Sequence, residues 1–194
     1  MDDSEEGRRA SVVTKAILDV VAAVPQSHEI QAIAPASRAR EIRVAAARRA
    51  AAVSGTLALP PGLFGVLTIL PDLAAVWRIQ AQMVADIAAV YGRTPQLQQE
   101  QMLYCLFRHA AAQVVRDLVA RAGKRVVFRR GTLHLLQNVA AKLGVHVSRR
   151  VIAGAAARWI PLLGAMGVAG YAYYDTNQVG ATAVELFEGG DGLS

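Results

Sequence analysis

A chain of 194 residues is long enough for one domain with a sizeable core. Hydrophobic residues make up 54% of it and aromatic residues only 6%, and this alanine-rich composition favours helices over strands. The net charge of +6 favours anionic partners, and a single cysteine, Cys105, excludes an internal disulfide and a cysteine-based metal site.

The N-terminal part of the chain predicts two helices. Residues 1–10 are polar and are expected to be flexible; helical apolar spacing then begins at Val12 and stops at Pro25. A second helix, rich in alanine and arginine, is expected over about 27–53, with Pro35 as a point of division. Its arginines predict an exposed basic face: Arg38, Arg40, Arg43, Arg48 and Arg49.

Residues 50–71 carry no charge and contain Pro60-Pro61-Gly62. A membrane-spanning helix needs about 20 apolar residues in succession, and the two prolines would break it. The stretch therefore predicts an apolar hairpin, either buried or seated at a membrane interface.

Helix signals continue through the rest of the chain. Asp72 is expected to cap the next helix, Gly92 to end it, and Thr94-Pro95 to start the following one. The helices are expected at about 73–91, 95–121, 124–143, 148–160 and 161–187, before a flexible glycine-rich tail over 188–194.

The last of these helices has an apolar first half. Residues 159–170 show no polar face, which is typical of a segment that lies in a core or against a membrane. Gly164, Gly167 and Gly170 are three residues apart, so we predict that they let another helix backbone approach closely.

The positive charge is concentrated in one segment. Residues 116–158 hold ten Lys and Arg against one acidic residue, a net charge of +9. An anionic membrane surface, nucleic acid and plain solvent are all open as surroundings for this segment. Phe128 is its only aromatic residue, which weakens the case for nucleic acid. The residues that would bind an anionic surface are Arg121, Lys124, Arg125, Arg129 and Arg130.

A polar face on the 73–91 helix is a candidate site. Its residues could form a network with the last helix, or could be an ordinary solvated face. The candidate residues are Asp72, Arg78, Gln82 and Asp86, with Asp175 and Gln178 from the last helix. Gln80 lies on the apolar side of the same helix and, if buried, is expected to bond a backbone carbonyl.

The sequence offers no catalytic constellation. Asp72 and Asp86 are about 21 Å apart along a helix, too far to act as a pair. The four histidines have no partner at metal-ligand spacing, and no nucleotide-binding loop is present. We therefore assign no catalytic residue, no metal and no cofactor.

The order of several short motifs resembles the EcsC family. The motifs are Leu59-Pro60-Pro61-Gly62, then Leu70-Pro71-Asp72-Leu73, then Ile87-Ala88-Ala89-Val90-Tyr91-Gly92, and near the end Ile160-Pro161-Leu162-Leu163-Gly164 with Thr176-Asn177-Gln178-Val179-Gly180. The resemblance covers roughly residues 45–187. It implies a cytoplasmic or membrane-peripheral helper linked to a transporter, and it carries no catalytic residues.

We therefore expect an all-α bundle of about six helices, forming a single domain over residues 11–187. The expected function is non-enzymatic, with an anionic membrane surface or a membrane protein as partner. Two alternatives remain: a small soluble enzyme with its site around Asp72, Arg78, Asp86 and Asp175, and a nucleic-acid-binding module that uses residues 116–158. The acidic N-terminus lacks the basic start of a signal peptide, so we expect a cytoplasmic location, peripheral at the inner face of the cell membrane.

Overall fold

The computed structural model describes residues 3–57, 69–109, 137, 140–145 and 161–189. Throughout these residues the regular structure is helical and no strand occurs, so the prediction of an all-α fold is confirmed. The main helices are α1 (Asp3–Ala22), α2 (Pro35–Leu57), α3 (Ile69–Val90), α4 (Gln99–Phe107) and α7 (Pro161–Glu188), with a short 3-10 turn at Thr94–Gln96.

Helix α1 begins at Asp3, whereas the sequence predicted a flexible segment over residues 1–10. Acidic residues at 3, 5 and 6 suit the positive end of the helix dipole, which explains the earlier start. The predicted apolar spacing is present, since Val13, Ile17, Val20 and Val21 are buried. The chain then leaves the helix after Ala22, close to the predicted stop at Pro25.

Helix α2 differs from its prediction at both ends. It begins at Pro35 rather than near residue 27, because proline has a fixed backbone angle suited to the first position of a helix. Residues 24–32 run without helical structure instead, and Ala32 N donates to Val90 O at 3.0 Å. At its other end α2 continues through Ser54-Gly55, where the sequence predicted a break.

Half of the predicted apolar hairpin, residues 58–68, lies outside the described residues, and its two ends are helical, with α2 ending at Leu57 and α3 beginning at Ile69. Asp72 is therefore inside the first turn of α3 and not its cap. The end of α3 matches the prediction: Gly92 has a φ of +68°, which favours glycine. Gly92 N donates to Ala89 O and Arg93 N to Ala88 O, which closes the helix.

The sequence predicted that Thr94 and Pro95 would start the next helix, but they form the 3-10 turn instead. Helix α4 begins four residues later because Gln98 and Gln101 cap it reciprocally: each side chain bonds the backbone of the other residue.

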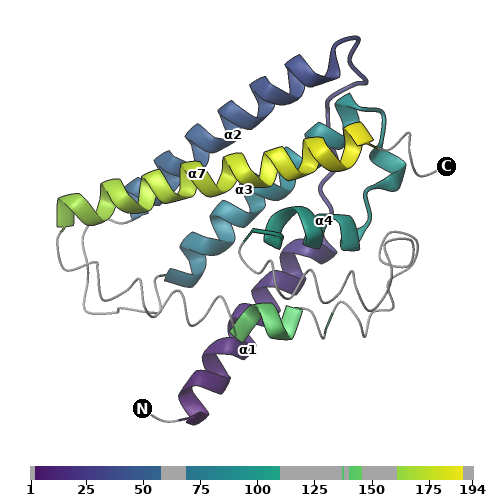
Figure 1. Cartoon of the computed structure of the whole chain (residues 1–194). Coiled ribbons are helices and arrows are strands. Elements are labelled where there is room, and N and C mark those ends of the chain that lie inside the picture. The colour runs from purple at the N-terminus through teal and green to yellow at the C-terminus, as the bar shows by residue number, and fades with distance from the viewer. Residues whose placement is uncertain (1–2, 58–68, 110–136, 138–139, 146–160, 190–194) are drawn as a thin grey trace.

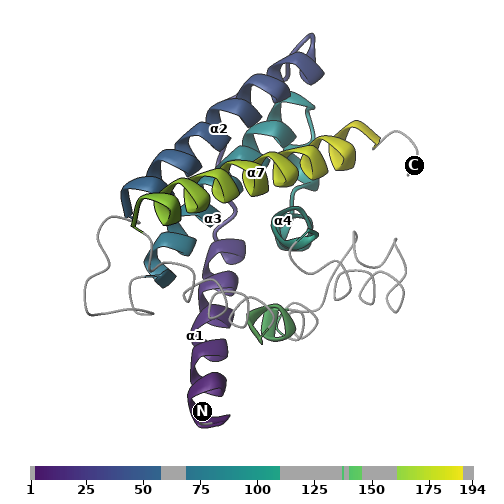
Figure 2. The same cartoon turned by 60° about the vertical axis from the view of Figure 1, so that its left-hand side comes forward.

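Helices α2 and α7 lie side by side and run antiparallel (Figures 1 and 2). Gly55 faces Ala169 and Gly180 faces Arg43, so late residues of α2 meet early residues of α7. Helix α3 packs against both and runs parallel to α7, as contacts of Val76 with Ala172 and of Gln80 with Asp175 indicate. Helix α4 lies beside the second half of α7, and α1 extends away from the layer of α2 and α7 (Figure 1).

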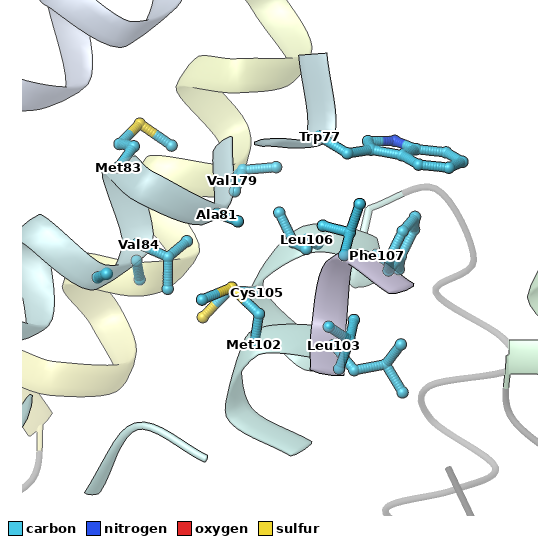
Figure 3. Packing of buried hydrophobic residues seen from close by; sticks show 14 of the residues in the cluster. Trp77, Ala81, Met83, Val84, Met102, Leu103, Cys105, Leu106, Phe107 and Val179 are labelled. Carbon is cyan, nitrogen blue, oxygen red and sulfur yellow. The ribbon is translucent and has the colours of Figure 1, made fainter. Parts of the chain in front are cut away.

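The main hydrophobic core is centred on α3 and α4. Trp77 and Phe107 meet edge to face, with ring centroids 5.3 Å apart (Figure 3). Met83, Val84, Met102 and Cys105 fill the space between α3, α4 and α7, and each is at most 1% exposed. Burial raises the pKa of the Cys105 thiol, in agreement with its interpretation as an inert core residue.

Candidate functional site

A polar cluster is buried between α3 and α7. Gln80 is fully buried, and its Nε2 donates to Asp175 Oδ2 at 2.8 Å and to Thr176 Oγ1 at 3.2 Å. Its Oε1 is also buried and has no hydrogen-bond partner in the described part of the chain. The sequence predicted that a buried Gln80 would need a partner, but the partners are a carboxylate and a hydroxyl instead of the expected carbonyl.

The end of α4 faces the same cluster. Burial lowers the pKa of His109, Asp175 raises it and Arg108 lowers it, so the imidazole is held towards its neutral form. Arg108 itself bonds Glu185 of α7, Nη1 to Oε2, at 2.7 Å and lies 5.4 Å from the centre of the Tyr104 ring. The ion pair ties the end of α4 to α7, and Gln80 ties α3 to α7, so this region joins three helices.

A second polar cluster lies on the opposite side of α3. Ser27 Oγ donates to Asp86 Oδ1 at 2.7 Å, and Gln82 Nε2 donates to the same oxygen at 2.9 Å. Gln82 Nε2 also lies 3.1 Å from the carbonyl oxygen of Gln26. The cluster therefore fastens the segment between α1 and α2 to the surface of α3.

The structure thus divides the polar network that the sequence predicted. Gln82 and Asp86 belong to the Ser27 cluster, whereas Asp175 belongs to the Gln80 cluster. Gln178 donates to Tyr174 Oη on its own helix at 2.7 Å, and Arg78 is exposed. Asp72 is in the first turn of α3, and its side chain is not among those that the structure describes. Asp86 and Asp175, two residues of the alternative enzyme site, therefore belong to different clusters on opposite sides of α3.

The structure does not test the predicted anionic-surface residues, because Arg121, Lys124, Arg125, Arg129 and Arg130 lie outside the described residues. A basic surface is nevertheless present on α2, where Arg40, Arg48 and Arg49 are exposed. Within the described ranges, no group of three or more His, Cys, Asp and Glu could hold a metal ion.

Gly167 and Gly170 do not make the predicted close contact with another helix in the described part of the chain. Both are exposed, and a Cβ added at either would meet no atom within 4 Å. The surroundings of Gly164 are not among those that the structure describes. Helix α7 packs on α2 through a different stripe, which includes Ala169, Thr176 and Gly180, and Gly167 falls on the far side of the helix from this stripe.

Helix α7 carries three exposed tyrosines: Tyr171 and Tyr174 lie on the face that α2 leaves open, and Tyr173 lies beside the contact with α2. Tyr171 and Tyr174 are each 61% exposed and Tyr173 is 40% exposed. They lie at the end of the charge-free stretch that begins at Trp159. Helical spacing puts Tyr171 and Tyr174 on one face of α7, and the packing of the helix shows that this face points outwards.

Comparison with known proteins gives the family. No curated protein and no solved structure matches the chain. The model of the EcsC protein family matches residues 11–188, nearly the whole chain, so the resemblance seen in the motifs is confirmed and the chain belongs to the EcsC family.

Proposed function

We propose that this EcsC-family protein is a non-enzymatic helper that attaches to the surface of a membrane at its cytoplasmic face. The observation that carries the proposal is the exposed surface of α7, where three tyrosines lie at the end of a stretch of sixteen residues, 159–174, with no charge. Tyrosine has an apolar ring and a polar hydroxyl and is enriched where membrane meets water. A transporter in the same membrane is the partner that the family resemblance implies.

Peripheral attachment fits this architecture better than a membrane span. Leu73–Val90 of α3 is long and apolar enough to cross a bilayer by length and composition, but 61% of it is buried inside the protein. The core helix of a soluble protein has the same properties, and its Gln80 is bonded within the protein. The surface of α7, and not a spanning helix, is therefore the proposed contact.

Co-sedimentation with lipid vesicles tests the proposal. The full chain should pellet with vesicles that contain anionic lipid. Tyr173→Ser with Tyr174→Ser should weaken this binding, since the two rings are exposed in the described fold. Ile30→Ser with Ile33→Ser is a matched control, because these side chains are 82% and 106% exposed but lie between α1 and α2. If the full chain pellets with neither anionic nor neutral vesicles, the proposal is wrong.

A further inference from the structure

The arginines of α2 differ in how their charge is balanced. Arg38 is neutralised by Glu29 at 2.7 Å and Glu41 at 2.8 Å, and this pairing lowers the pKa of Glu29. By contrast, no hydrogen bond or ion pair joins the side chain of Arg40, Arg43 or Arg48 to another residue in the described ranges. The same holds for Arg49, so α2 carries four positive charges without an acidic partner among the described residues.

The antiparallel pairing of α2 and α7 brings Arg48 close to Tyr173 along the junction of the two helices. Positions seven residues apart share a helix face. Arg48 is seven residues before Gly55, and Gly55 faces α7: a Cβ added to it would lie 3.5 Å from Cβ of Ala169. Tyr173 is likewise seven residues before Gly180, which faces Arg43. Measured along the helix axes, Arg48 of α2 and Tyr173 of α7 thus lie within about one helical turn of each other, and both are exposed.

We name this junction the α2–α7 seam, formed by Arg40, Arg43, Arg48, Tyr173 and Gly180. Gly180 has a packing role in it, because an added Cβ would lie 2.6 Å from Cγ and 2.8 Å from Cδ of Arg43. The hydrocarbon part of Arg43 therefore crosses the glycine, and its buried Nε has no partner in the described residues. Arg40 and Arg48 stand exposed on either side of it along α2.

We propose that the α2–α7 seam binds the phosphate groups of anionic phospholipids, with Arg40 and Arg48 as the phosphate ligands and Tyr173 at the level of the headgroups. This inference rests on the proposed function and names the surface that faces the bilayer. An arginine guanidinium matches phosphate oxygens with two parallel hydrogen bonds. The seam also borders Tyr174 and the charge-free beginning of α7, which favours a lipid surface over nucleic acid.

The test compares two pairs of charge-neutralising variants in the full chain. Arg40→Gln with Arg48→Gln removes the exposed charges of the seam. Lys15→Gln with Arg78→Gln removes the same charge from exposed positions on α1 and on the side of α3 turned away from α7. Binding is measured to phosphatidylcholine vesicles with and without phosphatidylglycerol, at low and high salt, and to a single-stranded RNA. Thermal unfolding followed by circular dichroism shows that each variant is folded.

The seam variant should bind anionic vesicles about 25-fold more weakly than the wild type at low salt, since each basic residue near an anionic surface contributes about fivefold. The control pair should stay within about twofold, and high salt should reduce the difference. Equal binding of both variant pairs would overturn the proposal that the seam binds lipid phosphate, while leaving the proposal of membrane attachment intact. Wild-type binding to neither vesicle type would overturn both proposals. Seam-dependent binding that is tighter for RNA than for vesicles would also overturn the lipid assignment.

Discussion

Helices α3 and α7 are both long and mostly apolar, but the protein surrounds them differently. Helix α3 contacts α1, α2, α4 and α7, and its Gln80 is fully buried with partners from α7. Among the described helices, α2, α3 and α4 cover one side of α7, and Tyr171 and Tyr174 are each 61% exposed. Hydrophobicity alone therefore does not separate a core helix from a contact surface; the directions from which neighbours pack decide the difference.

Truncation of one aromatic side chain in each helix should give the largest contrast. Trp77→Ala in α3 should lower the free energy of unfolding by about 3–5 kcal/mol, because it removes a ring that is 6% exposed and packed on Phe107. Tyr174→Ala in α7 should change it by less than about 0.5 kcal/mol. Urea denaturation measures both. Similar losses for the two variants would show that α7 is covered on its tyrosine side.

The buried amide of α3 offers a second contrast. Gln80→Glu keeps the shape of the side chain but places a carboxylate next to Asp175 in a fully buried position. The free energy of unfolding at neutral pH should fall by about 3 kcal/mol, since an unpaired buried charge is strongly unfavourable. Burial and the neighbouring Asp175 raise the pKa of the introduced carboxyl, so acidification should recover part of the loss. A variant as stable as the wild type would mean that water reaches the cluster.

Two glycines within α7 sharpen the comparison further. Gly167→Ala should raise the free energy of unfolding by about 0.5–1 kcal/mol, because the glycine is exposed and an added Cβ meets nothing within 4 Å. Gly180→Ala should be less stable than Gly167→Ala by at least about 1 kcal/mol, because its Cβ would overlap Arg43. The reverse order in thermal melts would contradict the orientation of α7.

The smallest effect is expected at the joint between α4 and α7. Burial lowers the pKa of His109 below its usual value of 6.5, so the unfolded chain binds a proton more readily than the folded one. This difference should make stability fall as pH decreases below about 6.5. His109→Gln should reduce that slope, whereas His28→Gln, an exposed position, is the control. Equal slopes in all three proteins would exclude His109 as the titrating group.

Local signals predicted the parts of the fold that depend on neighbouring residues. The end of α3 follows from Gly92, and the last helix was expected over 161–187 and is observed over Pro161–Glu188. The predicted start of α2 was wrong because residues 26, 27 and 32 form hydrogen bonds with α3, and such contacts leave no pattern in a sequence. Tertiary hydrogen bonds of this kind override a local helix preference.

The candidate site depended even more on contacts distant in sequence. The polar residues of α3 were recognised, but Thr176 was not, since a threonine on a helix has no distinguishing spacing. Helical spacing fixes where Gly167 and Gly170 lie around α7, yet it cannot show which side of the helix α2 covers. The unpaired arginines of α2 likewise became distinguishable only when Arg38 proved to have acidic partners and the others did not.

A polarity-sensitive fluorophore on the open face of α7 tests the central claim most directly. Cys105 is fully buried with a raised pKa, so a thiol-reactive dye should label only an introduced cysteine, at Tyr174→Cys or, as reference, at Lys15→Cys in α1. When anionic vesicles are added, emission from position 174 should shift to the blue while emission from position 15 stays unchanged. A protein that binds the vesicles while position 174 remains in a water-like environment would contradict the account.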